Sequence, residues 1–212
     1  MVRLYGYWTQ NSMKPIYVAE ELGIDYEFQF VDLVKGENRT DEIRALTPTG
    51  KVPLLQIDDK TLFESGAICR YLANTAHSPL YPEPPLERAW VDQWLDYFTC
   101  HLGRWLSLLY FETIIKKMAG MGDPDEKSCQ EAQRYIGEQM TVVDSCLTNH
   151  PYLTGDQPSI ADLFAFAYVE QIEPLKLSLA DYPHLERWYR RLESRPSVKQ
   201  ARDKVVPFGA PY

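Results

Sequence analysis

The chain has 212 residues, of which 45% are apolar and 25% charged, so it is long enough for one or two globular domains. Its 30 Asp and Glu residues outnumber 22 Lys and Arg residues, and the net charge of −8 argues against a surface for nucleic acid or an anionic membrane. The four cysteines and four histidines are too dispersed for a dithiol or a metal site. We see no apolar run typical of a signal peptide or a membrane span, so we expect a cytoplasmic protein without a metal.

Residues 1–77 predict a mixed α/β domain, because the spacing of apolar residues alternates between the periods of strands and helices. The predicted elements, in chain order, are a strand at 2–7, a helix at 12–22 closed by Gly23, a strand at 26–30, a short helix at 41–46, a hairpin of strands at 54–57 and 61–63, and a helix that follows an N-cap at Ser65. The order is β-α-β-α-β-β-α, and its first β-α-β connection should be right-handed.

Residues 78–85 contain four prolines and are the predicted linker, which places the domains at 1–77 and 86–212. The second domain is predicted to be all helical. Its expected helices lie at 86–118, at 125–147, after a capping box at Ser159–Asp162, and finally at 184–193. The aromatic side chains of Trp90, Trp94 and Phe98 recur at helical spacing and are expected in the core. Looser candidates for a substrate pocket are Tyr97, Arg104, Trp105 and Tyr110.

The segment between the first strand and the first helix is a candidate site for an anion. The N–H groups of a first helical turn and the helix dipole favour negative charge. Thr9, Asn11 and Ser12 offer hydrogen-bonding side chains there, and the segment has no cysteine. If thiol chemistry occurs here, the sulfur must come from a ligand whose thiolate these donors stabilise. The alternative is that Ser12 or Asn11 only caps the helix.

A second candidate site surrounds the predicted hairpin. Val52 precedes Pro53 and is therefore extended, so its backbone can pair with an extended peptide, next to Lys51. After the hairpin, the Glu64 carboxylate can meet a ligand ammonium, while Ser65 and the helix amides meet a carboxylate. The pattern indicates a site for the zwitterionic end of an amino acid.

Together these motifs resemble the cytosolic glutathione transferases. The resemblance rests on Gly50–Leu55 (GKVPLL), Phe63–Ile68 (FESGAI), Ala19–Glu27, Ser159–Asp162 and Tyr182–Leu185. It implies a thioredoxin-like domain followed by an all-helical domain, a homodimer, and glutathione as co-substrate. It also implies a cis peptide bond at Val52–Pro53, pairing of Val52 with the cysteinyl backbone of glutathione, and binding of the γ-glutamyl end by Glu64 and Ser65.

The loop at Thr9–Lys14 resembles that of the bacterial nu class, whose members have glutathione-dependent disulfide-bond reductase activity. The resemblance makes Thr9 and Asn11 donors to the glutathione sulfur and places Asn38 where that class has a glutathione-binding glutamine. Gln10 and Ser12 depart from the nu pattern, so Ser12, and after it Tyr7, stay open as alternatives. Tyr7 and Trp8 are also expected to line the pocket of the electrophile. Lys14 and Lys35 are candidates for the glycyl carboxylate but are expected to be solvated.

The sequence therefore predicts an enzyme that binds glutathione, stabilises its thiolate and directs it at an electrophile or a disulfide. Conjugation and disulfide reduction are alternative reactions of such a site. A third interpretation is a non-catalytic module that keeps the transferase fold for binding or assembly. The motifs at Lys51–Pro53 and Glu64–Ser65 argue against this, because a scaffold has no need of a zwitterion site.

Overall fold

The computed structural model describes residues 1–209, which form two compact units. The sheet unit consists of Met1–Tyr81 with the described residues from Glu193 onward, and the helical unit is Pro82–Leu192. The predicted combination of a thioredoxin-like domain and an all-helical domain is confirmed.

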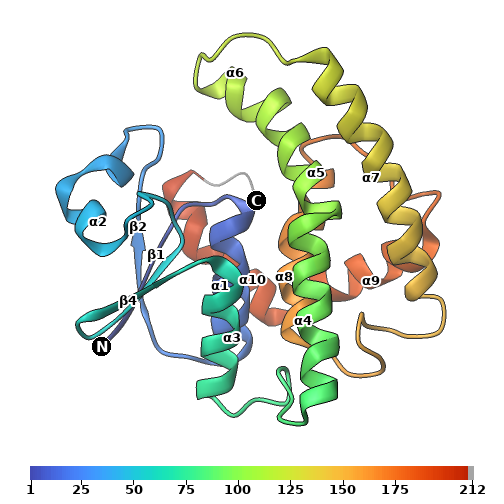
Figure 1. Ribbon diagram of the computed structural model, residues 1–212, viewed down its shortest axis with the longest axis horizontal. Helices are drawn as coiled ribbons and strands as arrows, with labels where there is room; N and C mark the ends of the chain where they lie inside the picture. The colour runs from blue at the N-terminus through green and yellow to red at the C-terminus, as the bar shows by residue number, and fades with distance from the viewer. Residues whose placement is uncertain (210–212) are drawn as a thin grey trace. The chain divides into compact units, whose positions relative to one another are not determined.

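The sheet unit is built on a four-stranded sheet in the order β2-β1-β3-β4 (Figure 1). Its elements are β1 (Val2–Gly6), α1 (Gln10–Glu21), β2 (Glu27–Phe30), the 3₁₀ turn η1 (Glu37–Arg39), α2 (Asp41–Leu46), β3 (Leu54–Ile57), β4 (Lys60–Phe63), α3 (Ser65–Thr75), α10 (Pro196–Val205) and the 3₁₀ turn η4 (Val206–Phe208). Strands β1 and β2 are parallel, and the other two pairs are antiparallel. Helices α1 and α3 lie on one face and α2 on the other (Figure 1).

Burial on both faces explains why neighbouring strand residues are apolar. Leu4 and Leu55 are opposite each other on β1 and β3, and both are fully buried. Their neighbours Tyr5 and Leu54 point to the other face and pack with Ile43 of α2. The core therefore has two layers, separated by the sheet.

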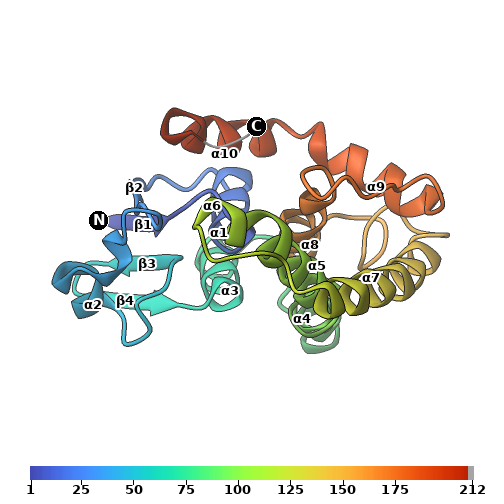
Figure 2. The same cartoon turned by 90° about the horizontal axis from the view of Figure 1, so that it is seen from above.

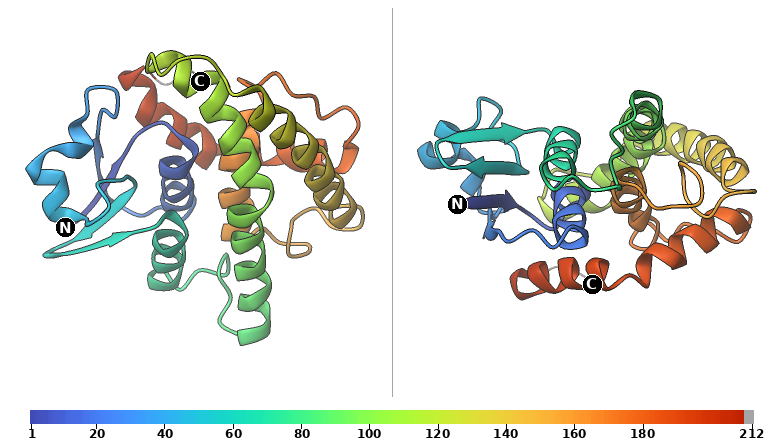
Figure 3. Two further views of the ribbon diagram at one scale, coloured as in Figure 1. Left: turned by 45° about the horizontal axis from the view of Figure 1, so that its top comes forward. Right: turned by 90° about the horizontal axis from the view of Figure 1, so that it is seen from below.

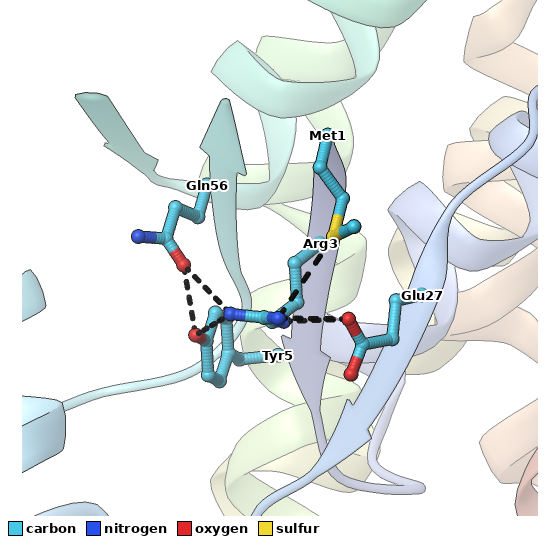
Figure 4. A network of polar contacts seen from close by, with 5 residues as sticks. All are labelled: Met1, Arg3, Tyr5, Glu27 and Gln56. Atoms are coloured by element: carbon cyan, nitrogen blue, oxygen red, sulfur yellow. Dashed lines mark hydrogen bonds and ion pairs between the residues drawn. The ribbon is translucent and has the colours of Figure 1, made fainter. Parts of the chain in front are cut away.

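A polar network joins β1 to its two neighbours, β2 and β3 (Figure 4). The Arg3 guanidinium donates to the Glu27 carboxylate with Nε–Oε2 at 2.9 Å, and the Tyr5 hydroxyl donates to Gln56 Oε1 at 2.9 Å. These bonds run from β1 to β2 on one side and to β3 on the other, and each adds to the pairing of its strands. The network supports the register on which the site described below depends.

The last helix, α10, was not predicted from the sequence, which places the final helix at 184–193. It packs along α1 (Figures 2 and 3). Arg195 and Ser197 bond to the Glu21 carboxylate, and Lys204 pairs with Glu20 at 3.3 Å. The apolar residues of its buried face are Val198, Ala201 and Val205, which are too few to predict a helix from the sequence. Packing on α1 stabilises the helix instead. These residues contact the first unit although the sequence counts them in the second domain; the boundary at 78–85 stays a prediction.

The helical unit contains the remaining helices (Figure 2). They are α4 (Pro85–Cys100), α5 (Leu102–Tyr110), the π-helical turn η2 (Phe111–Ile115), α6 (Lys116–Met118), α7 (Glu126–Cys146), α8 (Ile160–Val169), the 3₁₀ turn η3 (Glu170–Ile172) and α9 (Pro183–Glu193). The single helix predicted at 86–118 is interrupted at His101, where the backbone leaves the helical region (φ −119°, ψ −99°). Trp94 and Phe98 are buried as predicted, but Trp90 is 47% exposed, so the core prediction is wrong there.

The predicted capping box at the start of α8 is confirmed. Asp162 is fully buried and accepts from the backbone N–H groups of Leu153 (2.9 Å) and Ser159 (2.8 Å) and from Trp188 Nε1 (2.9 Å). Burial raises the pKa of the Asp162 carboxyl, while these donors oppose the rise. The side chain therefore joins the start of α8 to the loop before it and to α9.

Within residues 1–209, no helix combines the length and the apolar character needed to cross a membrane. The same residues contain no group of three or more side chains that could hold a metal ion.

Candidate functional site

The register of the sheet brings the predicted site residues to one end of its strands. We call this end, where β1 and β4 finish and β3 begins, the sheet edge. Tyr5 is opposite Leu54, and Leu54 is opposite Phe63. The chain leaving β1 toward α1, the chain entering β3 through Pro53, and the chain leaving β4 into Glu64 therefore all lie at the same end of the strands. The start of α1, the Val52–Pro53 segment and the start of α3 are thus neighbours, although they are far apart in the sequence.

Helix α1 begins at Gln10, two residues earlier than predicted, with Thr9 as its N-cap residue. Within residues 1–209, the Thr9 side chain makes no capping hydrogen bond. Ser12 is fully buried, and its Oγ accepts from the backbone N–H of Tyr7 at 3.0 Å. Asn11 is exposed on the first turn. The idea that Ser12 or Asn11 caps the helix is therefore wrong, and Asn11 and Thr9 differ from Ser12 in being accessible.

Lys14 was expected to be solvated, and this expectation is wrong. It is 1% exposed, and its Nζ donates to Asn11 Oδ1 at 2.8 Å. Burial lowers the pKa of Lys14 well below its usual range, against the opposing effects of Cys69 and Glu64, which places Lys14 on the α3 side of α1. Burial also raises the pKa of the Cys69 thiol to about 12, so this thiol is not a nucleophile. Lys35, in contrast, is exposed and pairs with Asp32.

An aromatic cluster lies beside the start of α1. Tyr7 stacks on Trp8 with ring centroids 4.0 Å apart, and both rings pack against Phe30 of β2. Phe208 of η4 stacks on Phe30 at 4.4 Å. Tyr7 is buried, with 3% of its surface exposed, whereas Trp8 is half-buried. Trp8 therefore presents more surface to an apolar ligand than Tyr7 does.

The segments around the hairpin have the expected backbone. The cis peptide bond at Val52–Pro53 is confirmed, and Lys51 is exposed. Glu64 immediately precedes α3 with a left-handed φ of 71°, a conformation that costs a non-glycine residue about 1–3 kcal/mol. Ser65 is the first residue of α3 rather than its N-cap, and among the described residues the Glu64 side chain makes no capping bond. The strained backbone holds an exposed carboxylate beside the helix start.

Asn38 connects the η1 segment to the loop before β3. Its Nδ2 donates to the Gly50 carbonyl at 2.8 Å. Beside this bond lies an open pocket of about 510 Å³, lined by Asn38, Arg39, Arg44 and residues 47–50. The two arginines make this pocket suitable for an anionic group.

Sequence reasoning named Lys14 but missed its burial, and it missed the two arginines altogether. The signal for Lys14 is weak, because a lysine three residues after an asparagine is ordinarily a surface pair. Its burial follows from the eight consecutive buried residues at 12–19, since α1 is covered by the sheet, by α3 and by α10. Arg39 and Arg44 carry no motif and meet only because η1 and α2 fold together.

The fold defines a protein with a thioredoxin-like domain followed by an all-helical domain. Comparisons with known proteins are specific. Residues 1–74 match the family model for the glutathione S-transferase N-terminal domain, and residues 98–196 match that for the C-terminal domain.

Relatives match over nearly the whole chain. A probable glutathione S-transferase, GSTF2, of Oryza sativa subsp. japonica is 33% identical over 97% of this chain and 98% of its own length. Glutathione S-transferase 1 of Zea mays is 32% identical over 97% of this chain and 98% of its own.

Solved structures agree with this. A glutathione S-transferase-I bound with lactoylglutathione has a TM-score of 0.86 at 32% identity, covering 94% of this chain and 97% of its own. A theta-class enzyme of Xanthomonas axonopodis pv. citri with glutathione bound has a TM-score of 0.86 at 31% identity, covering 94% and 96%. The chain belongs to the glutathione S-transferase family. The nu-like subclass stays a prediction.

Proposed function

We propose that this protein is a glutathione transferase that binds glutathione at the sheet edge described above and conjugates it to an electrophilic substrate. The observation that carries the proposal is the convergence of three segments at that edge: the start of α1, the extended Val52, and the strained Glu64 at the start of α3. Each segment suits one part of an extended tripeptide with a thiol.

The tripeptide is assigned along the edge from its γ-glutamyl end. Glu64 pairs with its ammonium, while Ser65 and the first amides of α3 bind its α-carboxylate. Val52 pairs with the cysteinyl backbone as an added strand. The glycyl carboxylate then extends past Lys51 toward the pocket of Asn38, where Arg39 and Arg44 supply positive charge.

The sulfur lies over the first turn of α1 in this proposal. The Thr9 hydroxyl and the Asn11 amide donate to the thiolate, and the helix dipole lowers the thiol pKa. The thiolate attacks an electrophilic carbon next to Trp8; a carbon–sulfur bond forms, the leaving group departs with its electron pair, and the thiol proton has gone to solvent beforehand. The protein contributes positioning and electrostatic stabilisation. We assign Ser12 a structural role, because its side chain is fully buried and its Oγ accepts from the Tyr7 N–H.

Disulfide reduction is a second candidate for the same thiolate. Thr9 and Asn11 start α1 without a cysteine, which leaves the ligand thiolate as the attacking sulfur. Attack on a mixed disulfide forms a new sulfur–sulfur bond and expels the other sulfur as a thiolate.

The test is a parallel assay of the purified protein with glutathione and either an aryl halide or a small mixed disulfide. We expect turnover of the aryl halide, and Asn11→Ala should reduce kcat/KM by about tenfold to a hundredfold by removing a bond to a charged sulfur. Ser12→Ala is the matched control and should keep its activity. Turnover of the disulfide alone would favour the reductase reaction. No turnover of either, with retained folding, would leave the binding-module interpretation.

The homodimer and the cytoplasmic location also stay proposals. Phe63 of β4 and Tyr71 of α3 are about 40% exposed on the sheet unit, which suits burial against a second copy. Light scattering on a size-exclusion column should give twice the chain mass of 24.6 kDa. A monomer at micromolar concentration would contradict the dimer, and cell fractionation tests the location.

A further inference from the structure

We propose that Lys14 is a positioning residue that holds the Asn11 carboxamide with its oxygen turned inward, so that only the Nδ2 side is presented to the thiolate. This inference rests on the proposed function, because it requires Asn11 to contact the glutathione sulfur. It assigns a role in the reaction to a buried lysine that does not itself reach the reacting atoms.

The geometry begins with the different exposure of the two residues. Asn11 lies on the open first turn of α1, while Lys14, one turn further along the same helix face, is 1% exposed. Their bond, Nζ to Oδ1 at 2.8 Å, therefore runs from the interior to the surface. Lys14 holds the amide from beneath the site.

The chemistry of the two groups fixes which amide atom faces outward. The Lys14 amine has N–H donors whether or not it is charged, and here Nζ donates to the amide oxygen of Asn11 and not to its nitrogen. A planar carboxamide held by its oxygen directs its N–H groups to the other side. Without the lysine, Asn11 could turn its oxygen to the sulfur, where it would face a thiolate with like partial charge. With its oxygen held by Lys14, the Asn11 amide presents only donors, which suit a thiolate because a thiolate only accepts hydrogen bonds.

The first turn of α1 has a further need for this bond. Pro15 lies four residues after Asn11 and has no N–H to donate to the Asn11 carbonyl, so the usual backbone bond at this place is lacking. The Lys14 bond supplies a connection from the Asn11 side chain to the helix interior. This bond is made to the side-chain oxygen of Asn11 and adds a contact next to the backbone carbonyl that lacks the proline N–H.

Burying an amine at this place is costly, which is why a purely structural role is a poor explanation. Desolvation lowers the pKa of Lys14, and a methionine of similar length would fill the same volume without a charged form to desolvate. Glu64 is one of the groups that act on Lys14 electrostatically, and it is also the proposed partner of the γ-glutamyl end. Lys14 is therefore linked to the proposed sulfur end by its bond to Asn11 and to the proposed γ-glutamyl end by the charge of Glu64.

The test is a double-mutant cycle with Lys14→Met, Asn11→Ala and the double variant. The quantity measured is the pH at which half of the enzyme-bound glutathione is thiolate, followed by its ultraviolet absorbance. We expect each single change to raise this midpoint by about one pH unit, as for the loss of a bond to a charged group. Because Lys14 acts through Asn11, Lys14→Met should add little in the Asn11→Ala background. Lys60→Met, at the exposed turn of the hairpin, is the matched control.

The possible results distinguish a failure of the proposed contact between Asn11 and the sulfur from a failure of the proposed role of Lys14. If Asn11→Ala leaves the midpoint unchanged, the proposed sulfur contact fails. If Asn11→Ala raises it and Lys14→Met does not, the sulfur contact stands and the role of Lys14 is overturned. An undiminished effect of Lys14→Met in the Asn11→Ala background would also overturn it, because Lys14 would then act directly through its charge. Should Lys14→Met fail to fold, Lys14→Gln, which keeps an N–H donor, should retain a midpoint near that of the unmodified protein, and a rise of a full pH unit would count against positioning.

Discussion

Two helix starts of the helical unit, those of α7 and α8, are built differently from two of the sheet unit, those of α1 and α3. In the helical unit, α7 is capped by Asp125, which accepts from the Ser128 N–H at 2.7 Å, and α8 by the complete capping box of Ser159 and Asp162. In the sheet unit, α1 and α3 begin at Thr9 and Glu64, whose side chains make no capping bond within the described residues. Helices α7 and α8 bond first-turn N–H groups with their own side chains, whereas the side chains at the starts of α1 and α3 do not, and Thr40 makes α2 the capped exception in the sheet unit.

The difference teaches where binding capacity resides. A capped start contributes about 1 kcal/mol to stability and has its donors already occupied. An uncapped start exposes N–H groups and positive dipole to solvent, and both are then available to an anion. The two uncapped starts lie at the same sheet edge, which is where the proposed glutathione site needs donors for a thiolate and a carboxylate.

The largest effect on the free energy of unfolding is expected at the start of α8, where Asp162 accepts from several buried donors. Asp162→Ala leaves four buried donors without their acceptor, so it should lower the free energy of unfolding by about 3–5 kcal/mol. Denaturant titration measures this loss. The KM for glutathione should be unchanged at a temperature where the variant is folded, because Asp162 serves stability alone. A loss of less than about 1 kcal/mol in the free energy of unfolding would contradict the stabilising role of this capped helix start.

At the uncapped start of α3 the expected effects have opposite signs. Glu64→Gly removes the carboxylate and should weaken binding of glutathione at least tenfold, the effect of about 1.4 kcal/mol. It also relieves the backbone at φ 71°, which should stabilise the fold by about 1 kcal/mol. Calorimetry measures both. Lys176→Gly, another exposed residue with positive φ (54°), should stabilise the fold without changing binding. If Glu64→Gly bound immobilised glutathione as well as the unmodified protein does, the assignment of Glu64 to the glutathione site would be wrong.

Lys14 provides a prediction about pH. Burial holds the Lys14 pKa below its ordinary value of 10.5, so between the two values the unfolded chain binds a proton that the folded chain does not. The contribution of Lys14 to stability is therefore present above pH 10.5 and is lost as the pH falls through the lowered pKa. Relative to the unmodified protein, Lys14→Met should gain stability as the pH falls across this window. Urea unfolding at a series of alkaline pH values measures the difference, and a constant difference would contradict the lowered pKa.

The smallest effect is expected from Ser12→Ala. The change leaves the Tyr7 N–H without its acceptor, at a cost of about 1 kcal/mol to the free energy of unfolding. The pH midpoint of bound glutathione should stay where it is, since the hydroxyl is buried. Thermal unfolding and thiolate absorbance give the two readings. A rise in this pH midpoint would indicate that Ser12, rather than Asn11, donates to the glutathione sulfur.

The success of sequence reasoning differed from element to element. The helix at 41–46 was predicted with its observed bounds, because Thr40 and the acidic first turn are strong local signals. The start of α1 was placed two residues late, since Thr9 caps without a side-chain bond and leaves no such signal. Helix α10 was missed altogether, because its few apolar residues gain their meaning from α1, far away in the chain.

The same division holds for the candidate site. The sequence by itself determined the β-α-β-α-β-β-α order, the helical second domain, and the motifs around Val52 and Glu64, because period, turn chemistry and the residue before a proline act locally. Only the tertiary structure decided that Ser12 is buried and accepts from Tyr7, that Lys14 is buried and bonds Asn11, and that Arg39 and Arg44 share a pocket with Asn38. Burial and orientation depend on what packs against a helix from distant parts of the chain, and a local pattern carries no record of those partners.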